Sequence, residues 1–181
     1  MFIEVIIIAV LFSLITGGKL TNLGQLNFRC FYMVIAAYVI QSGIDYWATG
    51  QRFGGYPYLH MVSYFILFFV LFQNRRLPGM YFIIIGTLLN FIVISLNGGQ
   101  MPVSPDILPE NLSQELAAGH GGTHNLLTGD TRVKFLADIF HIRYFNQNQL
   151  ISIGDIIIDI GAFLLVFMGM KRSGEWRVES G

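Results

Sequence analysis

The chain has 181 residues, of which 54% are hydrophobic, 14% aromatic and only 12% charged. Soluble domains carry about 25% charged residues, so this composition indicates an integral membrane protein rather than a soluble domain. The 11 basic and 11 acidic residues cancel, and no basic run suggests a nucleic-acid surface, so nucleic acid is excluded as an expected partner.

Five apolar stretches come close to the ~20 residues that a helix needs to cross a bilayer. Backbone groups in lipid must bond within their own segment, so each stretch is predicted to be a helix. The first carries Glu4 where a signal peptide has basic residues, and is therefore predicted to be a retained anchor. The expected fold is an all-α, five-span bundle forming one domain over 1–181, with spans at about 2–16, 30–49, 58–73, 78–96 and 150–170.

The lysines and arginines predict the orientation of these spans. Basic residues are enriched in cytoplasmic connections. Seven of them fall on one side of the predicted bundle and four on the other, which places the N-terminus outside and the C-terminus in the cytoplasm. The seven are Lys19, Arg29, Arg75, Arg76, Lys171, Arg172 and Arg177, and the four are Arg52, Arg132, Lys134 and Arg143.

The connection 97–149 is long and polar, and it is predicted to be an ordered outer loop. Residues 111–116 form a candidate short helix that Asn111 or Ser113 can cap. Further on, the apolar residues recur with helical period, which predicts an interfacial helix lying on the bilayer or over the bundle. These residues are Val133, Leu136, Phe140 and Tyr144, with Phe135, Ile139 and Ile142 beside them.

Polar and ionisable residues of the spans concentrate toward the outer side, under this loop. Asp155 and Asp159 are the most informative, because a charged group deep in a bilayer costs on the order of 3 kcal/mol and usually marks a partner or a cavity. Asp155 is expected to lie near Asp138, Asn97 and Gln100 of the loop. The predicted polar cluster comprises Asp155, Asp159, Asn90, His60, Asp45, Asn97 and Gln100.

Three chemistries are open to the aspartates. Two carboxylates held close together can share a proton and activate water, with Asp155 and Asp138 as the candidate catalytic pair. One buried carboxylate can relay protons or bind a cation. Alternatively, a carboxylate can accept hydrogen bonds from neighbouring helices and serve only the structure.

The sequence predicts no cofactor and no metal site. His120 and His124 have a spacing that brings two imidazoles together on a helix, but Gly121 and Gly122 lie between them and disfavour that helix. Cys30 is the only cysteine, which excludes an intrachain disulfide.

Two resemblances follow from local motifs. The segments Gly98-Gly-Gln-Met-Pro-Val-Ser104, Phe135-Leu-Ala-Asp138 and Ser152-Ile-Gly-Asp155 together resemble a bacterial polytopic membrane family of unknown function. Residues 152–166 are similar to the last span of lipoprotein signal peptidase, which implies catalytic roles for Asp155 and Asp138. The Gly-Asn-x-x-Asp-Arg motif of that enzyme is absent, and it has four spans where five are predicted here.

The leading functional prediction is a non-catalytic accessory or structural subunit of an assembly in the bacterial inner membrane. Its expected partners are the bilayer and other membrane subunits. An aspartic membrane hydrolase is the second hypothesis, and a proton or cation pathway is the third.

Overall fold

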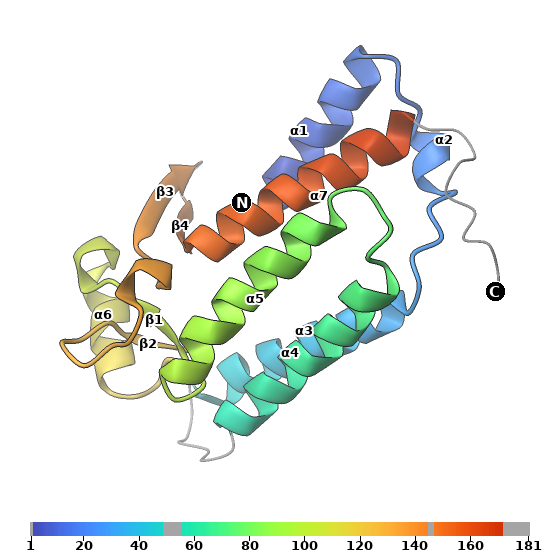
Figure 1. Ribbon diagram of the computed structural model, residues 1–181. Helices are drawn as coiled ribbons and strands as arrows, with labels where there is room; N and C mark the ends of the chain where they lie inside the picture. Colours follow the sequence, from blue (N-terminus) through green and yellow to red (C-terminus); the bar gives the residue numbers. More distant parts are fainter. Residues whose placement is uncertain (1, 49–55, 145–146, 172–181) are drawn as a thin grey trace.

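The computed structural model describes residues 2–48, 56–144 and 147–171. Most of these residues are helical, as predicted. Five long helices lie side by side in a row in which each packs on the next: α1, α7, α5, α4 and α3 (Figure 1). Their bounds are Phe2–Ile15 for α1, Phe31–Ala48 for α3, Tyr56–Gln73 for α4, Met80–Leu96 for α5 and Ile153–Lys171 for α7.

Glycines bring α5 and α7 into close contact at the centre of this row. A side chain built on Gly86 would collide with the carbonyl oxygen of Gly154, and one built on Gly161 would lie 2.7 Å from the carbonyl oxygen of Gly79. Small residues at such crossings let two helix backbones approach each other, which is typical of helix pairs in membranes. The close contact also places the beginning of α7 against the middle of α5, where Asn90 lies.

The segment between α5 and α7 folds into a cap over one end of the helices (Figure 1). It lies where α3 and α5 end and where α4 and α7 begin. Two short parallel strands pair within the cap, and an antiparallel hairpin leads into α7. The elements are β1 (Met101–Val103), α6 (Glu110–Ala117), β2 (His124–Leu126), β3 (Phe140–Tyr144) and β4 (Gln147–Ile151).

The predicted interfacial helix is wrong. A 3-10 turn at Lys134–Leu136 is followed by strand β3 instead. Val133 has a left-handed backbone (φ +53°) and Ala137 is extended, which interrupts any helix through this region. From Phe140 onward, apolar and polar residues also alternate with period two, and the hairpin with β4 satisfies their backbone groups.

The remaining differences are smaller. Residues 111–116 do form part of a helix, α6, but Pro109 occupies its N-cap and no side chain caps it, so the predicted caps are wrong. A one-turn helix that was not predicted, α2 (Leu20–Leu23), packs on α7. The predicted start of the last helix at 150 is also early, because 147–151 belong to β4.

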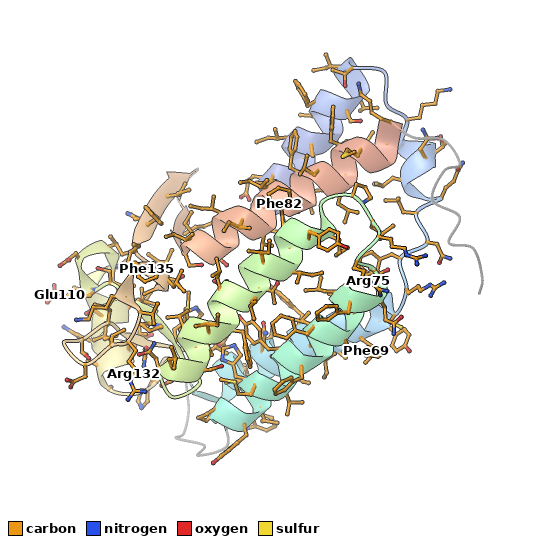
Figure 2. All side chains as sticks on the ribbon, viewed as in Figure 1. Phe69, Arg75, Phe82, Glu110, Arg132 and Phe135 are labelled. Carbon is orange, nitrogen blue, oxygen red and sulfur yellow. The ribbon has the colours of Figure 1, made fainter. Side chains whose placement is uncertain are left out.

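Within the described ranges, one helix is both long and apolar enough to cross a membrane: Ile153–Lys171. Three others are apolar but shorter, namely Phe2–Ile15, Pro57–Gln73 and Met80–Leu96. Large hydrophobic side chains are nevertheless exposed along the helices; Phe69 of α4 and Phe82 of α5 are two of them (Figure 2).

Candidate functional site

A polar cavity of about 180 Å³ lies where the cap meets α3, α4, α5 and α7. We call it the cap cavity. It is smaller than the roughly 300–1,000 Å³ clefts that hold drug-sized ligands. The lining residues are Gln41, His60, Tyr64, Asn90, Ile94, Met101, Thr123, His124, Asp138, Leu150 and Asp155.

Asp155 lines this cavity, but its carboxylate is engaged in starting helix α7. The backbone N–H of Ser152 donates to Asp155 Oδ2 at 2.9 Å, and the backbone N–H of Asp155 donates to Ser152 Oγ at 3.0 Å. This reciprocal pair is a capping box, in which two otherwise unpaired backbone donors at a helix start are satisfied. The segment Ser152-Ile-Gly-Asp155 therefore has a structural explanation that involves no catalysis.

The other carboxylate oxygen of Asp155 joins α7 to α5. Asn90 Nδ2 donates to Asp155 Oδ1 at 2.7 Å, and Ser152 Oγ lies 2.9 Å from Asn90 Oδ1. Ser152 and Asn90 are both buried. Asn90 and Asp155, two members of the predicted polar cluster, are therefore in direct contact, and this contact links the two helices that the glycines bring together.

Asp138 reaches the cavity from the cap. Its backbone is held against β1, since its N–H donates to the Pro102 carbonyl at 2.9 Å and its own carbonyl accepts from Ser104 N–H at 3.0 Å. The residue is only 4% exposed, and its Oδ1 has no hydrogen-bond partner among the described residues. Burial, with a smaller contribution from the Asp155 carboxylate, raises the pKa of Asp138 to about 7.

A chain of polar contacts connects Asp45 of α3 with Asp138. The backbone N–H and the hydroxyl of Thr123 donate to Asp45 Oδ1 at 2.9 and 2.7 Å. The Thr123 oxygen lies 2.9 Å from His124 Nδ1, and His124 Nε2 lies 3.8 Å from Asp138 Oδ2. Burial of the ring lowers the pKa of His124, although 46% of its side chain is exposed, and the carboxylates of Asp45 and Asp155 oppose this effect. The neutral imidazole is therefore favoured.

His60 enters the cavity from α4. Its Nδ1 lies 2.7 Å from the carbonyl oxygen of Gly99, and its ring centroid is 5.3 Å from that of Tyr64. This contact fixes the ring between the helix and the first turn of the cap.

Asp159 does not line the cap cavity. It is 8% exposed and lies beside a second cavity of about 380 Å³, next to the start of α1. Asp155 borders both cavities. The second cavity is lined by Phe2, Gln149, Leu150, Ile151, Asp155, Ile158 and Asp159.

Asn97 and Gln100 were expected beside Asp155, but the structure gives them another role. Asn97 Nδ2 donates to the carbonyl of Arg132 and its Oδ1 accepts from Arg132 N–H, at 3.0 and 2.9 Å. Gln100 Nε2 donates to the carbonyls of Gly122 and His124 at 2.8 and 3.2 Å. Both amides hold the cap together, and neither lines the cap cavity.

Four cavity residues with polar side chains were missed as site candidates: Gln41, Tyr64, Thr123 and His124. His124 was considered only in a pair with His120, whose side chain is exposed on the surface. Thr123 and Gln41 carry no local signal, because their position depends on the packing of the cap on α3. Among residues 2–48, 56–144 and 147–171, no group of three or more His, Cys, Asp or Glu side chains is arranged to hold a metal ion.

The structure thus belongs to a mainly helical protein, in which a row of apolar helices is capped at one end by a small segment of strands and helices over a polar cavity. The chain belongs to the DUF5317 family, a family of unknown function, which matches residues 25–167. It is also similar to an uncharacterized protein of Thermotoga maritima, with 30% identity over 166 residues that cover 91% of this chain and 89% of the relative. No solved structure matches the chain.

Proposed function

We propose that this protein is an integral membrane protein of the bacterial inner membrane, with α1, α3, α4, α5 and α7 as its five spans. The exposed apolar side chains on these helices support the proposal, because water-facing helices carry polar outer faces. Seventeen residues of α5 extend about 26 Å, slightly less than the ~30 Å hydrocarbon core. Examples of the exposed side chains are Ile7, Ile8, Leu11, Tyr38, Val39, Phe65, Phe72, Phe82 and Leu88.

The placement of charge supports an orientation with the cap outside the cell. Arg75 lies at the end opposite the cap, whereas Glu110 and Arg132 lie in the cap (Figure 2). The backbone N–H of Lys19 donates to the carbonyl of Met170, at the C-terminal end of α7, and Figure 1 shows that this end of α7 is the one away from the cap. Since basic residues favour the cytoplasmic side, the cap is expected outside.

Within this membrane protein we assign a non-catalytic role, that of an accessory or structural subunit whose cap holds a small polar cavity. One observation carries the assignment: both oxygens of the Asp155 carboxylate are occupied by the capping box and by Asn90. A hydrolytic dyad needs two carboxylates that can both reach a water molecule and a substrate. Asp155 instead fixes the junction of α5, α7 and the cap.

Reporter fusions and native purification test this function. A reporter fused after Gly181 should score cytoplasmic, and one inserted near Gly121 should score external; the reversed pattern would refute the orientation. Purification from native membranes in mild detergent should yield the chain with other membrane proteins. Isolation as a lone monomer would contradict the accessory role and leave the topology unaffected.

An aspartic membrane hydrolase is the second candidate, favoured because Asp138 and Asp155 line one cavity and the charge of Asp155 contributes to the raised pKa of Asp138. Such an enzyme should restore prolipoprotein processing to cells that lack lipoprotein signal peptidase. Asp138→Asn should abolish the rescue while the protein still accumulates in the membrane. Failure of the wild-type chain to rescue would exclude the signal peptidase activity.

A further inference from the structure

The wall of the cap cavity offers hydrogen-bond acceptors and negative charge. The amide nitrogen of Gln41 already donates to Ser63 Oγ at 2.9 Å, and that of Asn90 donates to Asp155. Asp138 and Asp155 contribute carboxylates, and no lysine or arginine is among the described residues that line the cavity. A ligand that fits this wall therefore brings hydrogen-bond donors and positive charge.

Both histidines of the cavity are held with Nδ1 as the donor. The Gly99 carbonyl can only accept, so its contact with His60 requires a proton on Nδ1. The Thr123 hydroxyl donates to Asp45, so its oxygen can only accept from His124 Nδ1. In the neutral imidazoles, Nε2 is then an acceptor, and it belongs to a ring that lines the cavity.

His124 Nε2 and Asp138 Oδ2 are thus two acceptors that face each other at 3.8 Å. The separation is too long for a direct hydrogen bond, and a neutral imidazole has no proton on Nε2 to donate. Asp138 Oδ1 also lacks a partner within the described ranges of the chain, although the residue is only 4% exposed. Buried polar atoms are almost always satisfied, so the Asp138 carboxylate, which lines the cavity and has one oxygen without a partner among the described residues, is a group that lacks a donor.

We propose that the cap cavity binds a small primary ammonium ion, whose N–H groups bond to the carboxylate of Asp138 and to Nε2 of His124. An ammonium group carries several donors and one positive charge, which matches two neighbouring acceptors of which one is a carboxylate oxygen. Tyr64 lines the same cavity, and the face of a tyrosine ring attracts cations through the cation–π interaction. This inference depends on the proposed function in one respect only: because the cap is proposed to lie outside the cell, the ligand would come from the outer side of the membrane.

Other ligand classes fit less well. An anion would meet Asp138 and Asp155, and the described lining residues include no lysine or arginine to pair with it. A metal ion requires a converging set of ligands, which the described side chains do not provide. A quaternary ammonium ion has the charge but no N–H donor. The volume of about 180 Å³ selects a ligand with few non-hydrogen atoms.

The test is calorimetric titration of the purified full-length protein in lipid nanodiscs with ethylammonium, tetramethylammonium and propionate at pH 8. We expect saturable binding of ethylammonium in about the millimolar range, as suits a ligand this small, and no binding of the other two. Asp138→Asn should weaken binding at least tenfold. Asp130→Asn, at an exposed position of the same cap, should leave it within twofold.

The pH dependence of the wild-type protein gives a second measurement that needs no variant. A proton on Asp138 competes with the ligand, so binding should be about tenfold weaker at pH 6 than at pH 8. The titratable groups that share the cavity with Asp138 are His124 of β2, Asp155 of α7, and His60 and Tyr64 of α4, with Asp45 of α3 behind Thr123.

Equal binding of ethylammonium and propionate, or a pH-independent affinity, would overturn the inference. Absence of any ethylammonium binding by a protein that inserts with the predicted topology would also overturn it, while the proposed function would stand. If the reporter fusions contradict the predicted topology but the protein still binds ethylammonium, the proposed function would be refuted and the inference of an ammonium site would stand.

Discussion

Asp155→Ala removes the carboxylate that joins the start of α7 to α5. In the native protein this group accepts the Ser152 backbone N–H and the Asn90 side-chain amide, both of which are buried. After the substitution the Ser152 N–H and one Asn90 N–H lose their acceptor, and water reaches them only if the cavity admits it. Asp155→Ala is therefore expected to destabilise the protein without changing its helices.

The magnitude follows from the two parts of the interaction. Loss of an N-terminal cap costs roughly 0.5–2 kcal/mol. Loss of a hydrogen bond to a charged group costs roughly 1.5–3 kcal/mol. We therefore expect Asp155→Ala to reduce the free energy of unfolding by about 2–5 kcal/mol. Ser152→Ala, which keeps the carboxylate and its contact with Asn90, should cost about 1 kcal/mol.

The assay is reversible unfolding in mixed detergent micelles, followed by far-UV circular dichroism. Asp130→Ala serves as the control because that side chain is exposed in the cap. A double-mutant cycle with Asn90→Ala should give a coupling energy of about 1–3 kcal/mol between Asn90 and Asp155. If Asp155→Ala unfolds within 0.5 kcal/mol of the wild type, on the order of a neutral surface change, the structural role of Asp155 is refuted.

Three further outcomes are expected. Folding raises the pKa of Asp138 from 3.8 to about 7, so the folded protein binds this proton more tightly than the unfolded chain does. The free energy of unfolding should therefore be highest below pH 4, fall by up to about 1.4 kcal/mol per pH unit between pH 4 and pH 7, and then level off. Asp138→Asn should remove that slope, which unfolding measurements from pH 4 to 8 can test. An unchanged slope in the variant would show that another titratable group causes the pH dependence. Gly86→Leu should destabilise the pair of α5 and α7 by about 1–3 kcal/mol or prevent its assembly, because its side chain would meet Gly154 and Ile158, whereas Gly43→Leu in an open position of α3 should be tolerated in the same unfolding assay. Asp159→Asn should leave folding and the proton permeability of reconstituted vesicles unchanged if this carboxylate serves only the structure; loss of a proton flux with intact folding would support the pathway hypothesis instead.

The long helices could be predicted from the sequence because their signal is local. In lipid or in a protein core, the backbone N–H and C=O groups of a continuous apolar stretch such as 78–96 must form hydrogen bonds within that stretch, which favours a helix. Helix α5 lies within that range. The concentration of polar residues at one end of the helices was also visible, since it needs only the order of residues along each helix. Whether the shorter helices cross a bilayer remains a prediction.

The cap could not be predicted in the same way. The residues from Val133 to Tyr144 fit a helical period, but their structure depends on pairing with β1 and β4, which are distant or follow later in the chain. A short segment with mixed periodicity takes the structure that its tertiary partners stabilise.

The sequence by itself determined that Asp155 and Asp138 were the residues to examine, because unpaired carboxylates are costly wherever water is excluded. Only the tertiary structure decided their different roles. Both carboxylate oxygens of Asp155 accept hydrogen bonds, from Ser152 and from Asn90, whereas Asp138 faces His124 across 3.8 Å and its Oδ1 has no partner among the described residues. The physical reason is that the state of a carboxylate depends on the donors within about 3 Å of it. The fold brings donors from Asn90 of α5 and from Ser152 to Asp155, but it leaves Oδ1 of Asp138 without a donor among the described residues.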